Sequence, residues 1–390
     1  MKEGWEVKKL GEVCIIERGG SPRPINTYLT DSVDGVNWIK IGDACEGSKY
    51  ITSTKERIKP EGVKKSRMVH KGDFILSNSM SFGRPYILGI DGCIHDGWLV
   101  IHDKNNVFDK SYLYYYLGSP NIYREFQRLA VGGVVNNLNS ELVRNVKVAI
   151  PPLPEQSRIV EELDLLSNII EKKRQQLSEL DNLAQSIFYD MFGDPVTNEK
   201  GWEVKKLGKV CLIERGGSPR PISAFITNDD NGVNWIKIGD AEDGSMYINS
   251  TKEKIKPEGV KKSRMVHKGD FILSNSMSFG KPYILGVDGC IHDGWLVLRD
   301  ENNVFDKSFL YYYLGSSFIY NEFKRLAVGG VVNNLNSELV RSVSVAIPSF
   351  NLQQLFAKKI EAIEKQKALI KQSIAETEEL FNSRMDYYFN

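Results

Sequence analysis

The stretch Gly4-Trp5-Glu6-Val7-Lys8-Lys9-Leu10 decides the organisation of this chain, because it returns unchanged at residues 201–207. Aligned at a constant offset of 197 residues, positions 4–150 and 201–347 differ at 27 of 147 sites, without a gap. A repeat of this length has the size of a whole domain and is far longer than a solenoid unit. The sequence therefore predicts two nearly identical domains with two nearly identical binding surfaces. We expect their target to be itself repeated.

Composition places the chain among globular proteins with ordinary cores. Of its 390 residues 41% are hydrophobic and 26% are charged, and no window resembles a membrane span of ~18 apolar residues. The N-terminal residues lack the apolar core of a signal peptide. The five cysteines form no CxxC pair, so neither a zinc site nor a disulfide framework is expected. We expect a cytoplasmic protein without a membrane partner.

Charge is divided unevenly along the chain. Residues 1–150 carry a net charge of +4 and residues 201–347 carry +2, whereas residues 151–200 carry −5 and residues 348–390 are neutral. The repeats are thus mildly basic. This balance is compatible with binding of nucleic acid by the repeats, although it is weaker than that of strongly basic DNA-binding domains.

The segment after each repeat predicts a long helix. Residues 155–192 contain neither Gly nor Pro, and Gly193-Asp194-Pro195 is a termination signal. Apolar or small residues follow a 4-3 alternation, broken at Lys173, and the same alternation recurs after the second repeat, broken at Lys367. Each helix would be ~55 Å long. Each helix either packs only on its own repeat or pairs with the other as a coiled coil, and the pattern favours an antiparallel pair.

Within each repeat the pattern is mixed. Strands are expected at residues 36–42, 72–77 and 146–150, and helices at residues 109–117 and 122–130. The predicted fold class is α/β, with two globular domains in a pseudo-two-fold arrangement joined by two long antiparallel coiled-coil helices. One side of the helices is aromatic, which favours core packing over base stacking; it carries Tyr112, Tyr115, Tyr116, Tyr123 and Phe126.

A search for catalytic motifs finds none. The chain has neither a GxxxxGK[ST] phosphate loop nor GxGxxG, and it lacks the Asn/Asp-Pro-Pro-aromatic motif of amino-methyltransferases. His95-Asp96 recurs as His292-Asp293, each beside a tryptophan, but no nucleophile elbow accompanies either pair. A structural role for these histidines is favoured over a hydrolase site, and a non-enzymatic protein is expected.

Three loops carry the side chains that suit a nucleic acid. They are Arg18-Gly19-Gly20-Ser21-Pro22-Arg23-Pro24, the run from Ser77 to Arg84, and the run from Gly132 to Asn139. Arg and Asn are the side chains that read guanine and adenine edges, and Gly allows close approach of the backbone. The alternative for any single loop is an ordinary surface turn, but the recurrence of all three in both repeats favours a composite binding surface.

The candidate DNA-contacting residues of the first repeat are Arg18, Ser21, Arg23, Asn78, Ser79, Ser81, Arg84, His95, Asn136 and Asn137. Those of the second repeat are Arg215, Ser218, Arg220, Asn275, Ser276, Ser278, Lys281, His292, Asn333 and Asn334. No catalytic and no metal-binding residue is proposed.

Over its whole length the chain resembles the specificity (S) subunit of type I restriction–modification systems. The resemblance rests on the order of parts: the Trp5-Glu6-Val7 opening with the Gly19-Gly20-Ser21-Pro22 loop, the hinge Ile150-Pro151-Pro152-Leu153-Pro154-Glu155-Gln156, and the helix exit at Phe188-Tyr189-Asp190-Met191-Phe192-Gly193. The second hinge, Ile347-Pro348-Ser349-Phe350, departs from this form. The domains implied are a target-recognition domain at 1–150, a central helix at 151–196, a second recognition domain at 197–347 and a C-terminal helix at 348–390.

The resemblance implies a non-catalytic scaffold that reads double-stranded DNA. Because the proposed reading loops of the two repeats are identical except for Arg84 and Lys281, and an antiparallel helix pair would invert the second half-site, we expect a bipartite, interrupted palindrome. The resemblance also implies two modification (methyltransferase) subunits and restriction (motor-nuclease) subunits as partners, with no cofactor on this chain. S-adenosylmethionine, ATP and Mg²⁺ would be bound by those partners, and the helices would set the spacing of the half-sites. The main alternative from the residues alone is a two-fold symmetric module that binds a protein or glycan instead of DNA.

Overall fold

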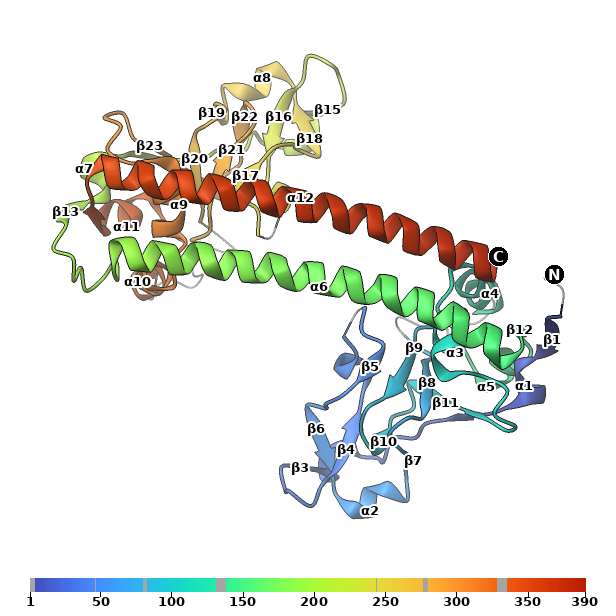
Figure 1. The fold of residues 1–390 in the computed structure, drawn as a ribbon. Helices are drawn as coiled ribbons and strands as arrows, with labels where there is room; N and C mark the ends of the chain where they lie inside the picture. The colour runs from blue at the N-terminus through green and yellow to red at the C-terminus, as the bar shows by residue number, and fades with distance from the viewer. Residues whose placement is uncertain are drawn as a thin grey trace. The chain divides into compact units, whose positions relative to one another are not determined.

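The computed structural model describes residues 4–45, 47–79, 83–130, 138–242, 244–275, 280–327 and 335–390 (Figure 1). The chain forms two compact units. Unit 1 comprises Met1–Lys172 and Ser373–Asn390, and unit 2 comprises Lys173–Gln372. Each unit thus holds one repeat together with part of each long helix. The domain limits expected from the sequence stay a prediction.

Three sheets with the same strand order occur in both units. In unit 1 they are β1-β12, β3-β6-β4-β10-β7 and β2-β11-β8-β9-β5. Their bounds are β1 Glu6–Lys9, β2 Cys14–Arg18, β3 Leu29–Thr30, β4 Val36–Ile39, β5 Tyr50–Ile51, β6 Glu56–Ile58, β7 Arg67–Val69, β8 Phe74–Ser77, β9 Pro85–Leu88, β10 Gly92–Ile94, β11 Trp98–Asp103 and β12 Lys147–Ile150.

In unit 2 the corresponding sheets are β13-β24, β15-β18-β16-β22-β19 and β14-β23-β20-β21-β17. Their bounds are β13 Glu203–Lys206, β14 Leu212–Arg215, β15 Ile226–Thr227, β16 Val233–Ile236, β17 Tyr247–Ile248, β18 Glu253–Ile255, β19 Arg264–Val266, β20 Phe271–Ser274, β21 Pro282–Leu285, β22 Gly289–Ile291, β23 Trp295–Arg299 and β24 Ser344–Ile347.

Helices accompany these sheets. In the first repeat they are α1 Leu10–Val13, α2 Pro60–Val63, α3 Lys110–Leu117, α4 Pro120–Ala130 and α5 Ser140–Arg144, with short 3-10 turns at Ile25–Thr27 and Ile41–Asp43. In the second they are α7 Leu207–Val210, α8 Pro257–Val260, α9 Lys307–Leu314, α10 Ser317–Ala327 and α11 Ser337–Ser342, with turns at Ile222–Ala224 and Ile238–Asp240. The long helices are α6 Leu153–Phe192 and α12 Phe350–Phe389.

The expected α/β fold with two long helices is confirmed. Helix α3 begins where Asp109 accepts hydrogen bonds from the backbone N–H groups of Ser111 and Tyr112, which is a typical N-cap. Strand β8 is buried over its whole length, as an apolar run between polar turns predicts. The aromatic residues expected in the core are buried, except Tyr123, which is 38% exposed.

Within each unit the two long helices run antiparallel and also pack on the repeat. In unit 1, Ile159 near the start of α6 and Phe389 at the end of α12 share the core of the first repeat. In unit 2, Phe188 near the end of α6 meets Phe356 near the start of α12, with ring centroids 5.7 Å apart. The antiparallel pair that the sequence favoured is therefore confirmed, and each long helix also packs on the repeats, as the other alternative expected.

Candidate nucleic-acid interface

The strand order β2-β11-β8 brings the predicted loops together at one end of these three neighbouring strands. Strand β11 runs antiparallel to both neighbours, with Arg18 at the end of β2 facing Leu99 and Ser77 at the end of β8 facing Trp98. The segments that follow β2 and β8 therefore lie beside the segment that precedes β11, which contains His95 and Asp96. The sheet order alone explains why residues far apart in sequence meet here.

Asp96 is the centre of this loop cluster. Its Oδ1 accepts a 2.6 Å hydrogen bond from the Ser21 hydroxyl, and its Oδ2 lies 3.3 Å from Nη2 of Arg23. Its backbone oxygen accepts hydrogen bonds from Nε of Arg18 over 2.8 Å and from Nδ2 of Asn78 over 3.1 Å. The bond from Ser21 lowers the pKa of the Asp96 carboxyl, and the His95 and Arg18 charges act in the same direction. Asp96 thus holds two of the three predicted loops together: its carboxylate binds the first loop, and its backbone oxygen binds both the first and the second.

The third loop joins the cluster through its last residues. The backbone N–H of Leu138 donates to the backbone oxygen of Asn78 over 3.0 Å. The next residue, Asn139, caps helix α5 by accepting a hydrogen bond from the N–H of Leu142. The described ends of the three loops therefore lie next to one another.

Unit 2 repeats this arrangement nearly atom for atom. The Ser218 hydroxyl donates to Oδ1 of Asp293 over 2.6 Å, and Nε of Arg215 donates to its backbone oxygen over 2.9 Å. Nη2 of Arg220 lies 3.5 Å from Oδ2 of the same residue, and Nδ2 of Asn275 donates to its backbone oxygen over 3.0 Å. Both repeats thus offer the same donors in the same geometry.

Close backbone approach explains the glycine in the first loop. A Cβ on Gly19 would lie 2.2 Å from the backbone oxygen of His95, and a Cβ on Gly216 would lie 2.1 Å from that of His292. No side chain fits at such a distance, so the loop requires glycine at this position. The arginine side chains that flank this glycine remain at the surface, and that of Arg23 is 79% exposed.

The histidines are held by the backbone. The N–H of Ile41 points at Nε2 of His95 over 3.1 Å, and the N–H of Gly97 points at Nδ1 over 2.7 Å. Burial lowers the pKa of His95 and of His292, although the neighbouring aspartates oppose this. A neutral imidazole offers one lone pair and an imidazolium offers none, so protonation would place donors against donors. The geometry favours a structural role for His95 and His292, and a DNA contact by either stays a prediction.

A hollow of about 810 Å³ lies beside the loop cluster of unit 2. Arg220 and His292 line it, together with the ion pair between Lys237 and Glu253. Its remaining lining residues are Ser218, Pro219, Pro221, Ile222, Ile226 and Trp235. The surface near Arg220 is therefore concave and carries both charged and apolar groups.

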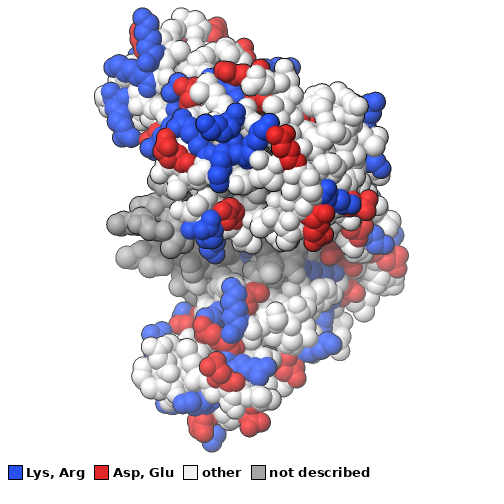
Figure 2. All heavy atoms as spheres, turned by 90° about the vertical axis from the view of Figure 1, so that its left-hand side faces the viewer, with Lys and Arg blue, Asp and Glu red and all other residues white. Residues whose placement is uncertain are grey.

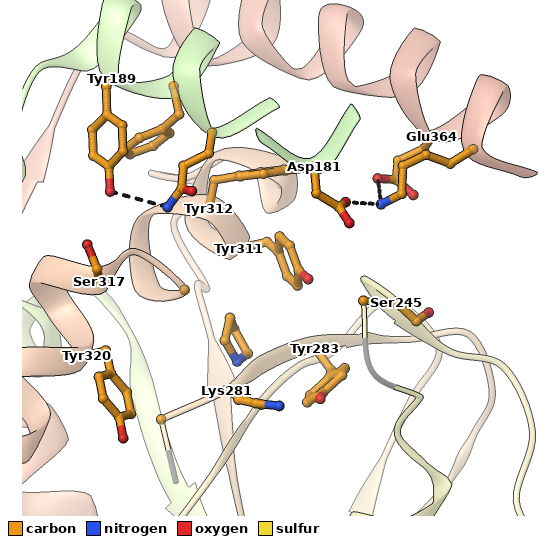
Figure 3. A pocket seen from close by; sticks show the side chains of 17 residues that line it. Asp181, Tyr189, Ser245, Lys281, Tyr283, Tyr311, Tyr312, Ser317, Tyr320 and Glu364 are labelled. Atoms are coloured by element: carbon orange, nitrogen blue, oxygen red, sulfur yellow. Dashed lines mark hydrogen bonds and ion pairs between the residues drawn. The ribbon is translucent and has the colours of Figure 1, made fainter. Parts of the chain in front are cut away.

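Lys281 lies in a different hollow. This second hollow, of about 580 Å³, is lined by α6, α12 and the repeat of unit 2 (Figure 3). Its walls include Tyr283 and Tyr311, and Lys367 lies with its Nζ 2.7 Å from Oδ1 of Asp181 and 2.8 Å from Oε1 of Glu364. The structure thus separates Lys281 from Arg220, although the sequence placed both on one surface.

The other predicted residues divide into two groups. Ser79 lies beside Gly97, next to the cluster, and Arg84 is exposed immediately before β9. Seven predicted residues lie outside the described ones, namely Ser81, Asn136, Asn137, Ser276, Ser278, Asn333 and Asn334. Their contact with DNA stays a prediction.

Sequence reasoning missed the central carboxylates. Asp96 and Asp293 entered only as partners in an unlikely catalytic pair, yet they bind Ser21, Arg23 and their counterparts directly. A usable signal was their position in a polar turn just before an apolar, buried strand. Pairing of β2 with β11 could not be read from either strand alone.

Comparison with known proteins decides the family. The sequence profile of the type I restriction modification DNA specificity domain matches residues 2–182 and again residues 199–379. The chain belongs to this type I specificity family. Specificity subunits recognise DNA sequence and are non-catalytic components of type I restriction–modification systems, which agrees with the lack of catalytic motifs here.

Relatives match over most of their length. The type I restriction enzyme MjaVIII specificity subunit of Methanocaldococcus jannaschii is 23% identical over 392 residues, covering 93% of this chain and 86% of the relative. The type I restriction enzyme EcoBI specificity subunit of Escherichia coli is 21% identical over 355 residues, covering 85% of this chain and 73% of the relative. The whole chain therefore corresponds to a specificity subunit, as its sequence resemblance predicted.

Solved structures share the fold. A chain from a structural study of complex assembly and conformational transition of the type I R-M system has a TM-score of 0.62 at 20% identity, covering 100% of this chain and 98% of that one. The S subunit of a type I restriction–modification system from M. genitalium has a TM-score of 0.56 at 13% identity, with the same coverage. At such identities the likeness concerns the fold alone.

The described residues hold neither a candidate metal site nor a candidate membrane-spanning helix. No group of three or more His, Cys, Asp or Glu among them is placed to hold a metal ion. No helix in the described ranges combines the length and apolar character needed to cross a bilayer.

Proposed function

We propose that this specificity subunit reads a bipartite, interrupted palindrome with its two repeats and serves as the scaffold for modification and restriction subunits. Each repeat would read one half-site through the loop cluster around Asp96 or Asp293. The reading loops of the two repeats are identical except that Arg84 corresponds to Lys281, so we expect equal half-sites. The second half-site would be inverted if the repeats are related by a two-fold axis.

The observation that carries this proposal is the duplicated loop cluster. Described residues of the first and second loops bind one aspartate in unit 1 and its counterpart in unit 2. The described end of the third loop binds the asparagine beside that aspartate in each unit. Residues 18–24 are identical to residues 215–221, and residues 132–139 are identical to residues 329–336. Arg can bind guanine through two parallel hydrogen bonds and Asn can bind adenine in the same way.

The partner chemistry follows from the family. A specificity subunit without catalytic motifs needs methyltransferase and motor-nuclease subunits to modify or cleave DNA. We propose two modification subunits and further restriction subunits as partners, which bind S-adenosylmethionine, ATP and Mg²⁺ themselves. The helices α6 and α12 would set the distance between the half-sites. The proposal that this chain assembles with partner subunits is supported by its similarity to a chain from a study of type I complex assembly.

Methylome sequencing of a host that expresses this chain with its modification subunit tests the proposal. The expected result is methylation at one interrupted motif whose two halves are inverted copies. A motif with two unrelated halves would contradict the equal-reader argument. A methylation pattern that does not depend on this chain would contradict the assignment as the reading subunit.

A further inference from the structure

The positive charge of each repeat is concentrated in one segment outside the predicted reading loops. Residues 55–71 contain seven Lys and Arg against two Glu, and residues 252–268 contain the same numbers. Since the first repeat has a net charge of +4 and the second +2, the remainder of each repeat is net negative. The attraction of either repeat for a polyanion therefore arises from this segment, which we call the basic segment.

The fold displays the basic segment as one surface feature. In unit 1 it runs through β6, α2 and β7, and in unit 2 through β18, α8 and β19. Six of its seven cations are exposed in unit 1, and only Arg67 is half-buried. Figure 2 shows Lys and Arg side chains gathered on the upper part of unit 2, at the level where Figure 1 places α8.

Within the part of the chain that the structure describes, most of these cations form no ion pair with a carboxylate. Among the described residues, no Asp or Glu oxygen lies within ion-pair distance of Lys59, Lys64 or Lys65. Nζ of Lys59 donates instead to the backbone oxygen of Thr27 over 2.8 Å, and Nζ of Lys65 donates to the Tyr28 hydroxyl over 2.6 Å. Neutral acceptors leave the positive charge uncompensated, so it is available to an anion.

The basic segment is continuous with the loop cluster. Nε of Arg67 donates to the backbone oxygen of Arg18 over 2.8 Å. A Cβ on Gly20 would lie 3.2 Å from the backbone oxygen of Lys65, so the first reading loop lies directly against the segment. A duplex whose bases meet the loop cluster would therefore bring its sugar–phosphate backbone near these cations.

The sequence of the basic segment is nearly the same in the two repeats, whereas a nearby segment differs. Within the basic segment the repeats differ only at Arg57, which corresponds to Lys254, and this change keeps the charge but loses the bidentate guanidinium. The nearby residues 26–34 differ from residues 223–231 at eight of nine positions. Both copies of the basic segment thus carry seven positive charges at the same positions. Phosphate contacts, which position a protein on DNA without reading sequence, need such charges.

We infer that the basic segments at 55–71 and 252–268 bind the phosphate backbone of double-stranded DNA, whereas the loop clusters read the bases. This inference rests on the proposed DNA-reading function and deepens it. Each lysine–phosphate contact releases condensed counterions, so the segments would supply most of the salt dependence of binding.

The test uses the full chain with Lys64→Gln, Lys65→Gln, Lys261→Gln and Lys262→Gln combined. A control combines Lys172→Gln, Lys358→Gln, Lys359→Gln and Lys371→Gln, which removes the same charge from exposed positions on α6 and α12. Binding to a random-sequence duplex is measured by fluorescence anisotropy between ~50 and ~200 mM salt. Thermal melting checks that both variants fold like the wild-type chain.

The expected result is a shallower dependence of log K on log salt for the segment variant, by ~0.9 for each lost phosphate contact. The control should keep the wild-type slope, and bases selected from a random duplex pool should be the same for all three proteins. A wild-type salt slope in the segment variant, or a change in the bases that it selects, would overturn this inference and leave the proposed function untouched. A wild-type chain without affinity for duplex DNA would overturn the proposed function itself.

Discussion

The Ser21 hydroxyl donates a 2.6 Å hydrogen bond to Oδ1 of Asp96, and Ser218 makes the same bond to Asp293 over the same distance. This bond leaves Oδ2 of the aspartate facing the exposed guanidinium of Arg23 or Arg220. The carboxylate is therefore a positioning group for an arginine that is otherwise free to sample many conformations. The first prediction follows from this relationship.

Asp96→Asn should reduce the discrimination of one half-site without unfolding the first repeat. The hydrogen bonds from Arg18 and Asn78 go to the backbone oxygen of Asp96, so they survive the change. The ion pair with Arg23 is lost, and removal of a negative charge should strengthen non-specific binding. Discrimination is measured as the ratio of the affinity for a cognate duplex to the affinity for a duplex with one scrambled half-site.

Asp34→Asn, at an exposed position away from the cluster, is the control. An equal affinity ratio in the two variants would refute a positioning role for Asp96.

Single-repeat changes of the proposed readers should weaken one half-site only. Arg23→Ala, or Asn136→Ala combined with Asn137→Ala, should cost roughly 1–3 kcal/mol if bidentate base contacts are lost. Arg220→Ala, or Asn333→Ala combined with Asn334→Ala, should do the same at the other half-site. Gel-shift titrations with each half-site scrambled in turn separate the two effects. Unchanged affinity in all four variants would place the reading surface elsewhere.

Some features of this site could be predicted from the sequence and others could not. The internal repeat, the α/β class and the long helices follow from local patterns, because periodicity and turn residues are properties of short segments. The meeting of Arg18, Asn78 and Asp96 depends on which strands are neighbours, and several pairings satisfy the same local pattern. The burial of Lys367 shows the same limit: the sequence marked it as a break in the apolar stripe, whereas its ion pairs make it part of the buried helix contact.

Acid should destabilise the fold as the pH falls below about 6.5, the ordinary value for histidine. Burial lowers the pKa of His95 and His292 in the folded chain, so below that pH the unfolded chain binds protons that the folded chain does not. Each histidine then lowers the free energy of unfolding by up to ~1.4 kcal/mol per pH unit until its folded pKa is reached. The carboxyl of Asp96, whose pKa is lowered, adds to this loss only near and below pH 3.8.

Urea unfolding at a series of pH values measures this dependence. NMR titration of the His95 and His292 ring protons provides the second readout, and both pKa values should lie below 6.5. A titration of either ring at or above 6.5 would contradict the assignment of these histidines as buried acceptors of backbone N–H groups.

Removing the two carboxylates that pair with the buried Lys367 should lower the free energy of unfolding more than removing the Lys367 ammonium group. Burial lowers the pKa of Lys367, but Asp181 and Glu364 outweigh this and raise it above its ordinary value. Asp181→Ala combined with Glu364→Ala would leave a buried ammonium without a partner and should cost ~3–5 kcal/mol. Lys367→Met should cost less, because Asp181 is half exposed and water can solvate it. Urea unfolding measures both, and an equal loss in the two variants would contradict this asymmetry.

The spacer between half-sites should respond to the length of the helices and not to the reading loops. Inserting four residues near Gln175 in α6 nearly preserves the apolar alternation and lengthens the helix by ~6 Å. A matching insertion near Ser373 in α12 keeps the partner in register, since within each unit the helices run antiparallel. At ~3.4 Å per base pair, the expected methylome motif has the same half-sites with a spacer longer by about one or two base pairs. A single insertion in α6 alone is the control, and it should impair assembly because the paired apolar stripes no longer match. Altered bases within the half-sites together with an unchanged spacer would mean that α6 and α12 do not set the spacing.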